Sequence, residues 1–140
     1  MENYDIRDIS LAPSGHQKIE WVRNNMPLLR GMEEEFSKTK PFEGIKISLS
    51  VHLEAKTAYL CKVLAAGGAE MSVTGSNVLS TQDDVAAALA DSGMKVFAYH
   101  GATPEEYDKH IEMCLEHKAN IIIDDGGDLV GMLHTKRPDL

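Results

Sequence analysis

Hydrophobic residues in the first third of the chain recur every three or four positions, which is the spacing of one helix face. The stripe consists of Ile19, Val22, Met26, Leu29, Met32 and Phe36. It predicts a long helix that begins near Ser14, a residue type suited to an N-cap. Pro27 lies inside the stripe and lacks a backbone donor, so we expect the helix to kink or end near Asn24. The preceding residues 5–13 are polar and predict no regular structure.

After Gly44, short apolar runs alternate with stretches of helical spacing. The apolar runs predict strands over residues 45–51, 69–74, 95–99 and 120–123. Capping residues and terminal glycines predict helices over residues 54–66, from Ser80 (with Asp83 in a capping box) up to Gly93, and from Thr103 to about His117. This alternation is typical of a parallel sheet with helices on both faces. We therefore predict an α/β, Rossmann-like fold preceded by a long N-terminal helix.

The last predicted strand, residues 120–123, is an uninterrupted β-branched run, which predicts burial on both faces. Only a short apolar segment follows it, through Met132 and Leu133. A chain of 140 residues is one domain by size. We therefore expect a single domain whose sheet lacks elements that a longer protein would supply.

Composition and charge argue against several classes of function. The apolar share of 43% suits a globular protein, and the net charge of −8 argues against nucleic-acid and anionic-membrane surfaces. The first residues resemble no secretory signal, and no apolar run approaches the roughly 20 residues that span a bilayer, so we expect a cytoplasmic protein. Cys61 and Cys114 match no metal or redox spacing, and we expect them to be buried free thiols.

Polar residues cluster directly after the strand over residues 45–51, in the segment His52-Leu53-Glu54-Ala55-Lys56-Thr57. Ligands of open α/β sheets bind beyond the carboxyl ends of the strands. Histidine titrates near neutrality, so His52 suits general acid–base chemistry. The alternative is that Glu54 is an ordinary first-turn acid and His52 an ordinary loop residue.

A second cluster, Asp124-Asp125-Gly126-Gly127-Asp128, follows the last predicted strand. Crowded carboxylates raise one another's pKa and can provide a base or bind a cation. The alternative is a plain turn, since turns favour Asp and Gly. Both clusters would face one crevice of a parallel sheet, which makes the pair more informative than either cluster alone.

Five segments together resemble the adenosylhomocysteinase family. They are Asp8-Ile9-Ser10-Leu11-Ala12, Asn25-Met26-Pro27, His52 to Thr57, Ser80-Thr81-Gln82-Asp83, and Asp124 to Leu129 with His134-Thr135-Lys136. The resemblance covers nearly the whole chain in order, but only the N-terminal third of that family. It implies an incomplete substrate-binding domain of a homotetrameric hydrolase that cleaves S-adenosylhomocysteine to adenosine and homocysteine. In that family a tightly held NAD oxidises the ribose 3′-hydroxyl, which permits elimination of the thiol.

The resemblance also assigns roles to individual residues. His52 would assist departure of the thiol and entry of water, and Asp125 would be a base near the ribose 3′ and 4′ positions. Substrate-binding positions are Leu53, Glu54, Lys56, Thr57 and Gln82. Gln82 would lie beside the purine, where a monovalent cation can sit, and no other metal is implied.

The chain departs from the common family pattern at two positions. Glu54 stands where most members have threonine, and Lys56 stands where they have a glutamate that accepts from the purine 6-amino group. Lysine only donates, which suits a 6-oxo group and points to S-inosylhomocysteine as substrate.

The dinucleotide motif G-x-G-x-x-G is absent, as are the family's catalytic lysine and NAD-binding domain. We therefore expect this chain alone to be inactive. The alternative function is a non-catalytic nucleoside-binding or assembly module that has kept the crevice without the chemistry.

Overall fold

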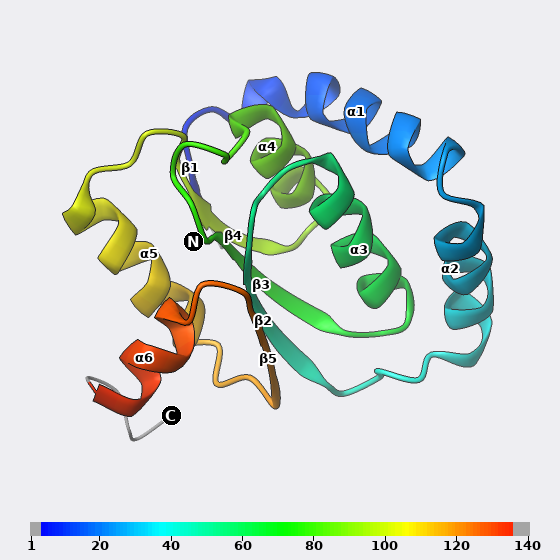
Figure 1. Ribbon diagram of the computed structural model, residues 1–140. Coiled ribbons are helices and arrows are strands. Elements are labelled where there is room, and N and C mark those ends of the chain that lie inside the picture. Colours follow the sequence, from blue (N-terminus) through cyan, green and yellow to red (C-terminus); the bar gives the residue numbers. More distant parts are fainter. Residues whose placement is uncertain (1–3, 136–140) are drawn as a thin grey trace.

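The computed structural model describes residues 4–135, so Lys136, which completes the last matching segment, lies outside the described part. Five parallel strands form one sheet in the order β1-β4-β3-β2-β5 (Figure 1). The strands are β1 Tyr4–Ile6, β2 Lys46–Val51, β3 Glu70–Gly75, β4 Lys95–Ala98 and β5 Ile121–Asp124. The predicted α/β fold with a parallel sheet is confirmed, and the carboxyl ends of all five strands lie at one edge.

Helices cover both faces of this sheet, as predicted. They are the 3₁₀ turn η1 Ile9–Leu11, α1 Ala12–Asn24, α2 Pro27–Thr39, α3 Ala55–Ala66, α4 Asp83–Asp91, α5 Pro104–Leu115 and α6 Asp128–Thr135. Helices α3 and α4 cover one face, with α1 packed on α4 and α2 on α3, while α5 and α6 cover the other face (Figure 1). None of the helices in the described part is long and apolar enough to cross a membrane.

The two faces of the central strands carry different side chains. Leu49 and Val73 are fully buried in the larger core cluster, on the side of α3 and α4. On the opposite side, the hydroxyls of Ser48 and Ser72 donate to the carbonyl of Cys114 over 3.1 and 3.2 Å. Carbonyls in the last turn of a helix have no partner within the helix, so these serines dock the end of α5 on the sheet.

Both cysteines are free and buried, as predicted. Burial raises the pKa of the Cys114 thiol to about 11 and that of Cys61 to about 12. Neither thiol is therefore activated as a nucleophile.

The predicted break in the first helix is confirmed, because α1 ends at Asn24 and α2 begins at Pro27. The helix begins close to Ser14, as predicted, at Ala12, but the predicted N-cap was wrong, because Leu11 and not Ser14 occupies that position. The hydroxyl of Ser14 instead donates to Asp84 of α4 over 2.8 Å.

The prediction of no regular structure over residues 5–13 was also wrong. Strand β1 pairs with β4 at the edge of the sheet, and η1 follows, capped by the Asp8 carboxylate. Asp5 secures β1, because its carboxylate accepts from the Tyr99 hydroxyl and lies 3.0 Å from Nε2 of His110. Three residues carry too little pattern to indicate a strand, and β1 depends on these distant partners instead.

The predicted N-terminal cap was correct for α5 and wrong for α4. The predicted start of α5 at Thr103 is confirmed, and the structure adds a capping box in which Thr103 and Glu106 each accept from the other's backbone N–H. Ser80 does not cap α4, which begins at Asp83 with Gln82 as its N-cap. Residues 77–81 form a separate turn, in which the carbonyl of Asn77 accepts from the backbone of Ser80.

The predicted burial of the last strand on both faces was wrong. Strand β5 lies at the edge of the sheet and pairs only with β2 among the described strands. Ile121 is 42% exposed, and the other residues of β5 are partly buried.

Candidate functional site

An open hollow of about 700 Å³ lies at the carboxyl edge of the sheet, where α1 passes the starts of α3 and α4. Its polar lining includes Ser14, Lys18, Glu54, Ser80, Gln82 and Asp84. Two of the predicted substrate-binding residues, Glu54 and Gln82, therefore line one hollow although 28 residues separate them in the chain.

His52 follows β2 directly and is exposed to solvent. Its Nδ1 lies 2.6 Å from Oγ of Ser80, and that hydroxyl donates to the carbonyl of Asn77 over 3.1 Å. A hydroxyl has one proton to donate, so this arrangement favours the tautomer in which His52 carries its proton on Nδ1. Nε2 of His52 is then left as the basic nitrogen.

The next residues of the segment act through the backbone and through helix capping. Leu53 is fully buried, and its carbonyl accepts from the backbone N–H of Gln82 over 3.0 Å. Glu54 is the N-cap of α3, where its Oε1 accepts from the backbone N–H of Thr57 over 3.0 Å. The same oxygen lies 3.4 Å from the Thr57 hydroxyl. The Lys56 side chain is exposed, and its ammonium makes no hydrogen bond or ion pair with a described residue.

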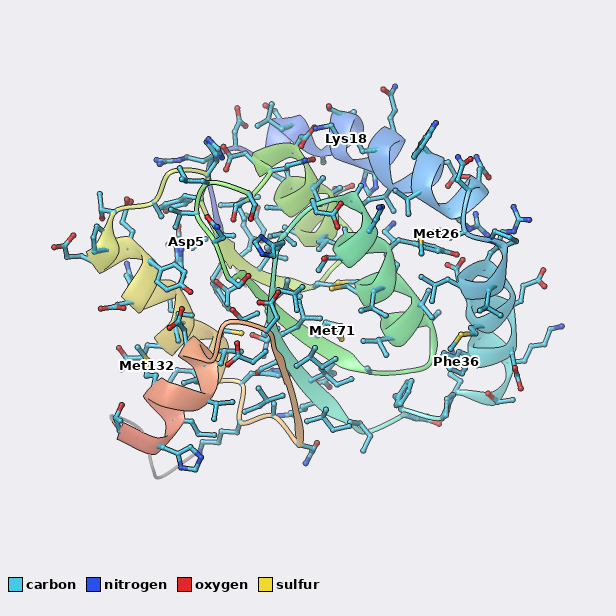
Figure 2. All side chains as sticks on the ribbon, in the orientation of Figure 1. Asp5, Lys18, Met26, Phe36, Met71 and Met132 are labelled. Atoms are coloured by element: carbon cyan, nitrogen blue, oxygen red, sulfur yellow. The ribbon has the colours of Figure 1, made fainter. Side chains whose placement is uncertain are left out.

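The structure adds a contact that the sequence did not indicate. Lys18, on the part of α1 that lies over α4 (Figure 2), places Nζ 3.2 Å from Oε1 of Gln82 and 2.8 Å from Oδ2 of Asp84. The ammonium thus lies beside Gln82, the residue near which the resemblance implied a monovalent cation. Lys18 and Gln82 are 64 residues apart in the chain. Lys18 lies on the polar face of the first amphipathic helix, so no local sequence pattern links the two residues.

The acidic cluster after β5 contains two aspartates with different environments. Asp124 holds the turn, since its Oδ1 accepts from the backbone N–H groups of Gly126 and Gly127, and its Oδ2 accepts from that of Val130. Asp125 is exposed, and its carboxylate accepts no hydrogen bond from a described residue. Its backbone N–H donates to Ser50 of β2 over 3.2 Å. Asp124 therefore stabilises the turn, whereas the carboxylate of the neighbouring Asp125 stays exposed and is the candidate site residue.

The third aspartate, Asp128, stands in the first turn of α6 and accepts from the Tyr107 hydroxyl over 2.5 Å. Burial, followed by the hydrogen bond to Asp128, raises the pKa of Tyr107 well above its ordinary value. This pair connects α6 to α5. Within residues 4–135, no three histidine, cysteine or acidic side chains are grouped closely enough to hold a metal ion.

We expect Asp124→Ala to lower the free energy of unfolding by about 1–3 kcal/mol, because three backbone donors lose their acceptor. The matched control, Asp125→Ala, removes a carboxylate that accepts none of these bonds and should change it by less than about 0.5 kcal/mol. Equilibrium denaturation of both variants measures the difference. Equal losses would contradict the division between the two aspartates.

The fold and the hollow define the class of the domain, an α/β domain with an open hollow, lined in part by polar side chains, at the carboxyl edge of a parallel sheet. The family model described as S-adenosyl-L-homocysteine hydrolase matches residues 3–139. The chain belongs to this family, and the resemblance seen in its sequence is confirmed.

Curated relatives with two different names are about equally similar to the chain. It is 53% identical over 137 residues to S-inosyl-L-homocysteine hydrolase of Methanocaldococcus jannaschii, covering 98% of this chain and 33% of the relative. It is 51% identical over 138 residues to adenosylhomocysteinase of Pyrococcus abyssi, covering 99% of this chain and 33% of the relative. It is 50% identical over 137 residues to adenosylhomocysteinase of Gloeothece citriformis, covering 97% of this chain and 32% of the relative. The chain thus spans about a third of the length of the curated relatives it matches.

Proposed function

We propose that the protein containing this chain is an NAD-dependent hydrolase that cleaves S-inosylhomocysteine or S-adenosylhomocysteine to a nucleoside and homocysteine. This chain would supply part of its substrate-binding domain. The observation that carries the proposal is the family match over residues 3–139, which includes the residues at the carboxyl edge of the sheet. Assembly as a homotetramer and a cytoplasmic location belong to the same proposal.

Two residues would act on the sugar. Nε2 of His52, left basic by the contact of Nδ1 with Ser80, would give a proton to the departing thiol and take one from the entering water. Asp125, whose carboxylate makes no internal hydrogen bond among the described residues, would take a proton near the ribose 3′ and 4′ positions. Both residues follow strands, β2 and β5, that lie next to each other in the sheet.

The NAD of this proposal, when bound, would supply the oxidation at the ribose 3′-hydroxyl. The chain has no G-x-G-x-x-G motif, so we propose that the dinucleotide is bound by a part of the protein outside these 140 residues. The purified chain should then release no homocysteine, whereas the full-length protein should release it and carry NAD detectable after denaturation. Homocysteine release by the 140-residue chain alone would contradict this assignment.

The base preference of the full-length protein tests the role of Lys56. Its ammonium is exposed and free of ion pairs with described residues, and it can only donate, so we expect it to favour a purine 6-oxo group over a 6-amino group. The ratio kcat/KM should then be at least about tenfold higher for S-inosylhomocysteine than for S-adenosylhomocysteine. Lys56→Glu should reverse the preference.

A matched control for that experiment is Lys62→Glu, which makes the same change of charge further along α3. It should leave the ratio unchanged. A clear adenosyl preference of the unmodified protein would rule out the assignment of Lys56.

A further inference from the structure

Lys18 connects α1 to the polar start of α4. Its Nζ donates to Oε1 of Gln82 over 3.2 Å and forms an ion pair with Oδ2 of Asp84 over 2.8 Å. Ser14, one helical turn earlier, donates to the same Asp84 oxygen over 2.8 Å. All four side chains line the hollow of about 700 Å³.

The contact fixes the orientation of the Gln82 amide. An ammonium group only donates hydrogen bonds, so the oxygen of the amide must face Lys18. Nε2 of Gln82 then carries two N–H donors, and no described residue accepts from them. The backbone of Gln82 is held as well, through its N–H bond to the carbonyl of Leu53. The side chain therefore presents a donor to the hollow in one fixed orientation.

The surroundings keep Lys18 in place. Burial alone would raise the pKa of the Asp84 carboxyl, but hydrogen bonds from Lys18 and Ser14 outweigh it and hold that pKa below its ordinary value. Gly15 allows the close approach of α1 and α4 on which both contacts depend, since a Cβ there would lie 1.9 Å from the carbonyl oxygen of Asp84.

We propose that Lys18 is a positioning residue of the nucleoside site, whose ammonium turns the Gln82 amide so that its N–H donors face the ligand. This inference rests on the proposed function and deepens it. The ligand atom opposite Gln82 is then a hydrogen-bond acceptor, such as an oxo group or an unprotonated ring nitrogen of the base. Lys18 acts through Gln82 and does not itself touch the reacting atoms.

Removal of the ammonium has a specific chemical consequence. Lys18→Met keeps the length of the side chain but leaves three oxygens, from Gln82, Asp84 and Ser14, around an empty position. Oxygen ligands that include a carboxylate attract small cations. Ammonium or potassium ions should therefore replace the lost group in the variant, and the unmodified protein should not respond to them.

The experiment uses the full-length protein and its Lys18→Met, Lys18→Arg and Lys38→Met variants. Lys38 is an exposed lysine of α2 and serves as the matched control. For Lys18→Met we expect KM for S-inosylhomocysteine to rise about tenfold, the size of one oriented hydrogen bond, with kcat little changed. Ammonium or potassium chloride should restore most of this loss, compared with choline chloride at equal ionic strength. Lys18→Arg keeps a donating cation and should retain most of the affinity, and Lys38→Met should behave as the unmodified protein.

Two results would overturn the assignment of Lys18. One is an unchanged KM in Lys18→Met. The other is a raised KM that neither ion reverses and that Lys18→Arg shares, which would mean a purely structural role. The thermal midpoint of Lys18→Met, which should rise in potassium relative to choline, gives a readout independent of activity. If the unmodified protein releases no homocysteine from either thioether, the proposed function fails, and the thermal midpoints still decide whether Lys18 occupies a cation position.

Discussion

Replacement of His52 by glutamine in the full-length protein should lower kcat for homocysteine release by about 10²–10⁴-fold, the range of one general acid–base residue. Glutamine keeps the approximate size of the side chain and can still reach Ser80, but it cannot exchange a proton near neutral pH. The nucleoside should still bind, because His52 lies beside the hollow and is not among the residues that line it. We therefore expect KM to change little. Steady-state assays of thiol release measure both quantities.

Two variants separate chemistry from positioning at His52. Ser80→Ala removes the partner of Nδ1 but leaves the imidazole, so kcat should fall by only about tenfold. His16→Gln changes a histidine on α1 that pairs with Asp91 and lies outside the hollow, and it should leave kcat unchanged. If His52→Gln retained more than half of the original kcat, His52 would have no role in proton transfer.

The parts of the fold that the sequence predicted correctly are those with local causes. Pro27 ends a helix because it lacks an N–H, and this holds whatever surrounds it. The helix start predicted at Thr103, with proline at the first helical position, likewise depends on atoms within a few residues of chain. The strand over residues 45–51 and the polar segment after it follow from the same kind of local pattern.

The parts that the sequence did not predict depend on which strands and helices are neighbours. The exposure of Ile121 follows from the position of β5 at the edge of the sheet, and periodicity within the strand carries no information on strand order. Strand β1 depends on Tyr99 and His110, about one hundred residues away. The candidate site shows the same division, since His52 and Asp125 follow strand ends visible in the sequence, whereas Lys18 reaches Gln82 only through the packing of α1 on α4.

The packing of α1 on α4 should be lost when Gly15 is replaced by alanine. A Cβ at this position would lie 1.9 Å from the carbonyl oxygen of Asp84 and 2.8 Å from Cβ of Ala88. The nearer atom belongs to the backbone, so no change of rotamer relieves the clash and the helices must separate. We expect the free energy of unfolding to fall by about 3 kcal/mol or more, the upper end of overpacking costs. The contacts of Ser14 and Lys18 with Asp84 would be broken at the same time.

Gly31 provides the matched control for this substitution. It lies inside α2, and a Cβ there would meet no atom within 4 Å. Gly31→Ala should therefore stabilise the protein by about 0.5–1 kcal/mol through the higher helix propensity of alanine. Equilibrium denaturation of the chain and amide hydrogen exchange of α1 and α4 in the full-length protein compare the two variants. If Gly15→Ala were as stable as Gly31→Ala, α1 would not pack on α4 as closely as described, and the orientation of Gln82 by Lys18 would lose its structural basis.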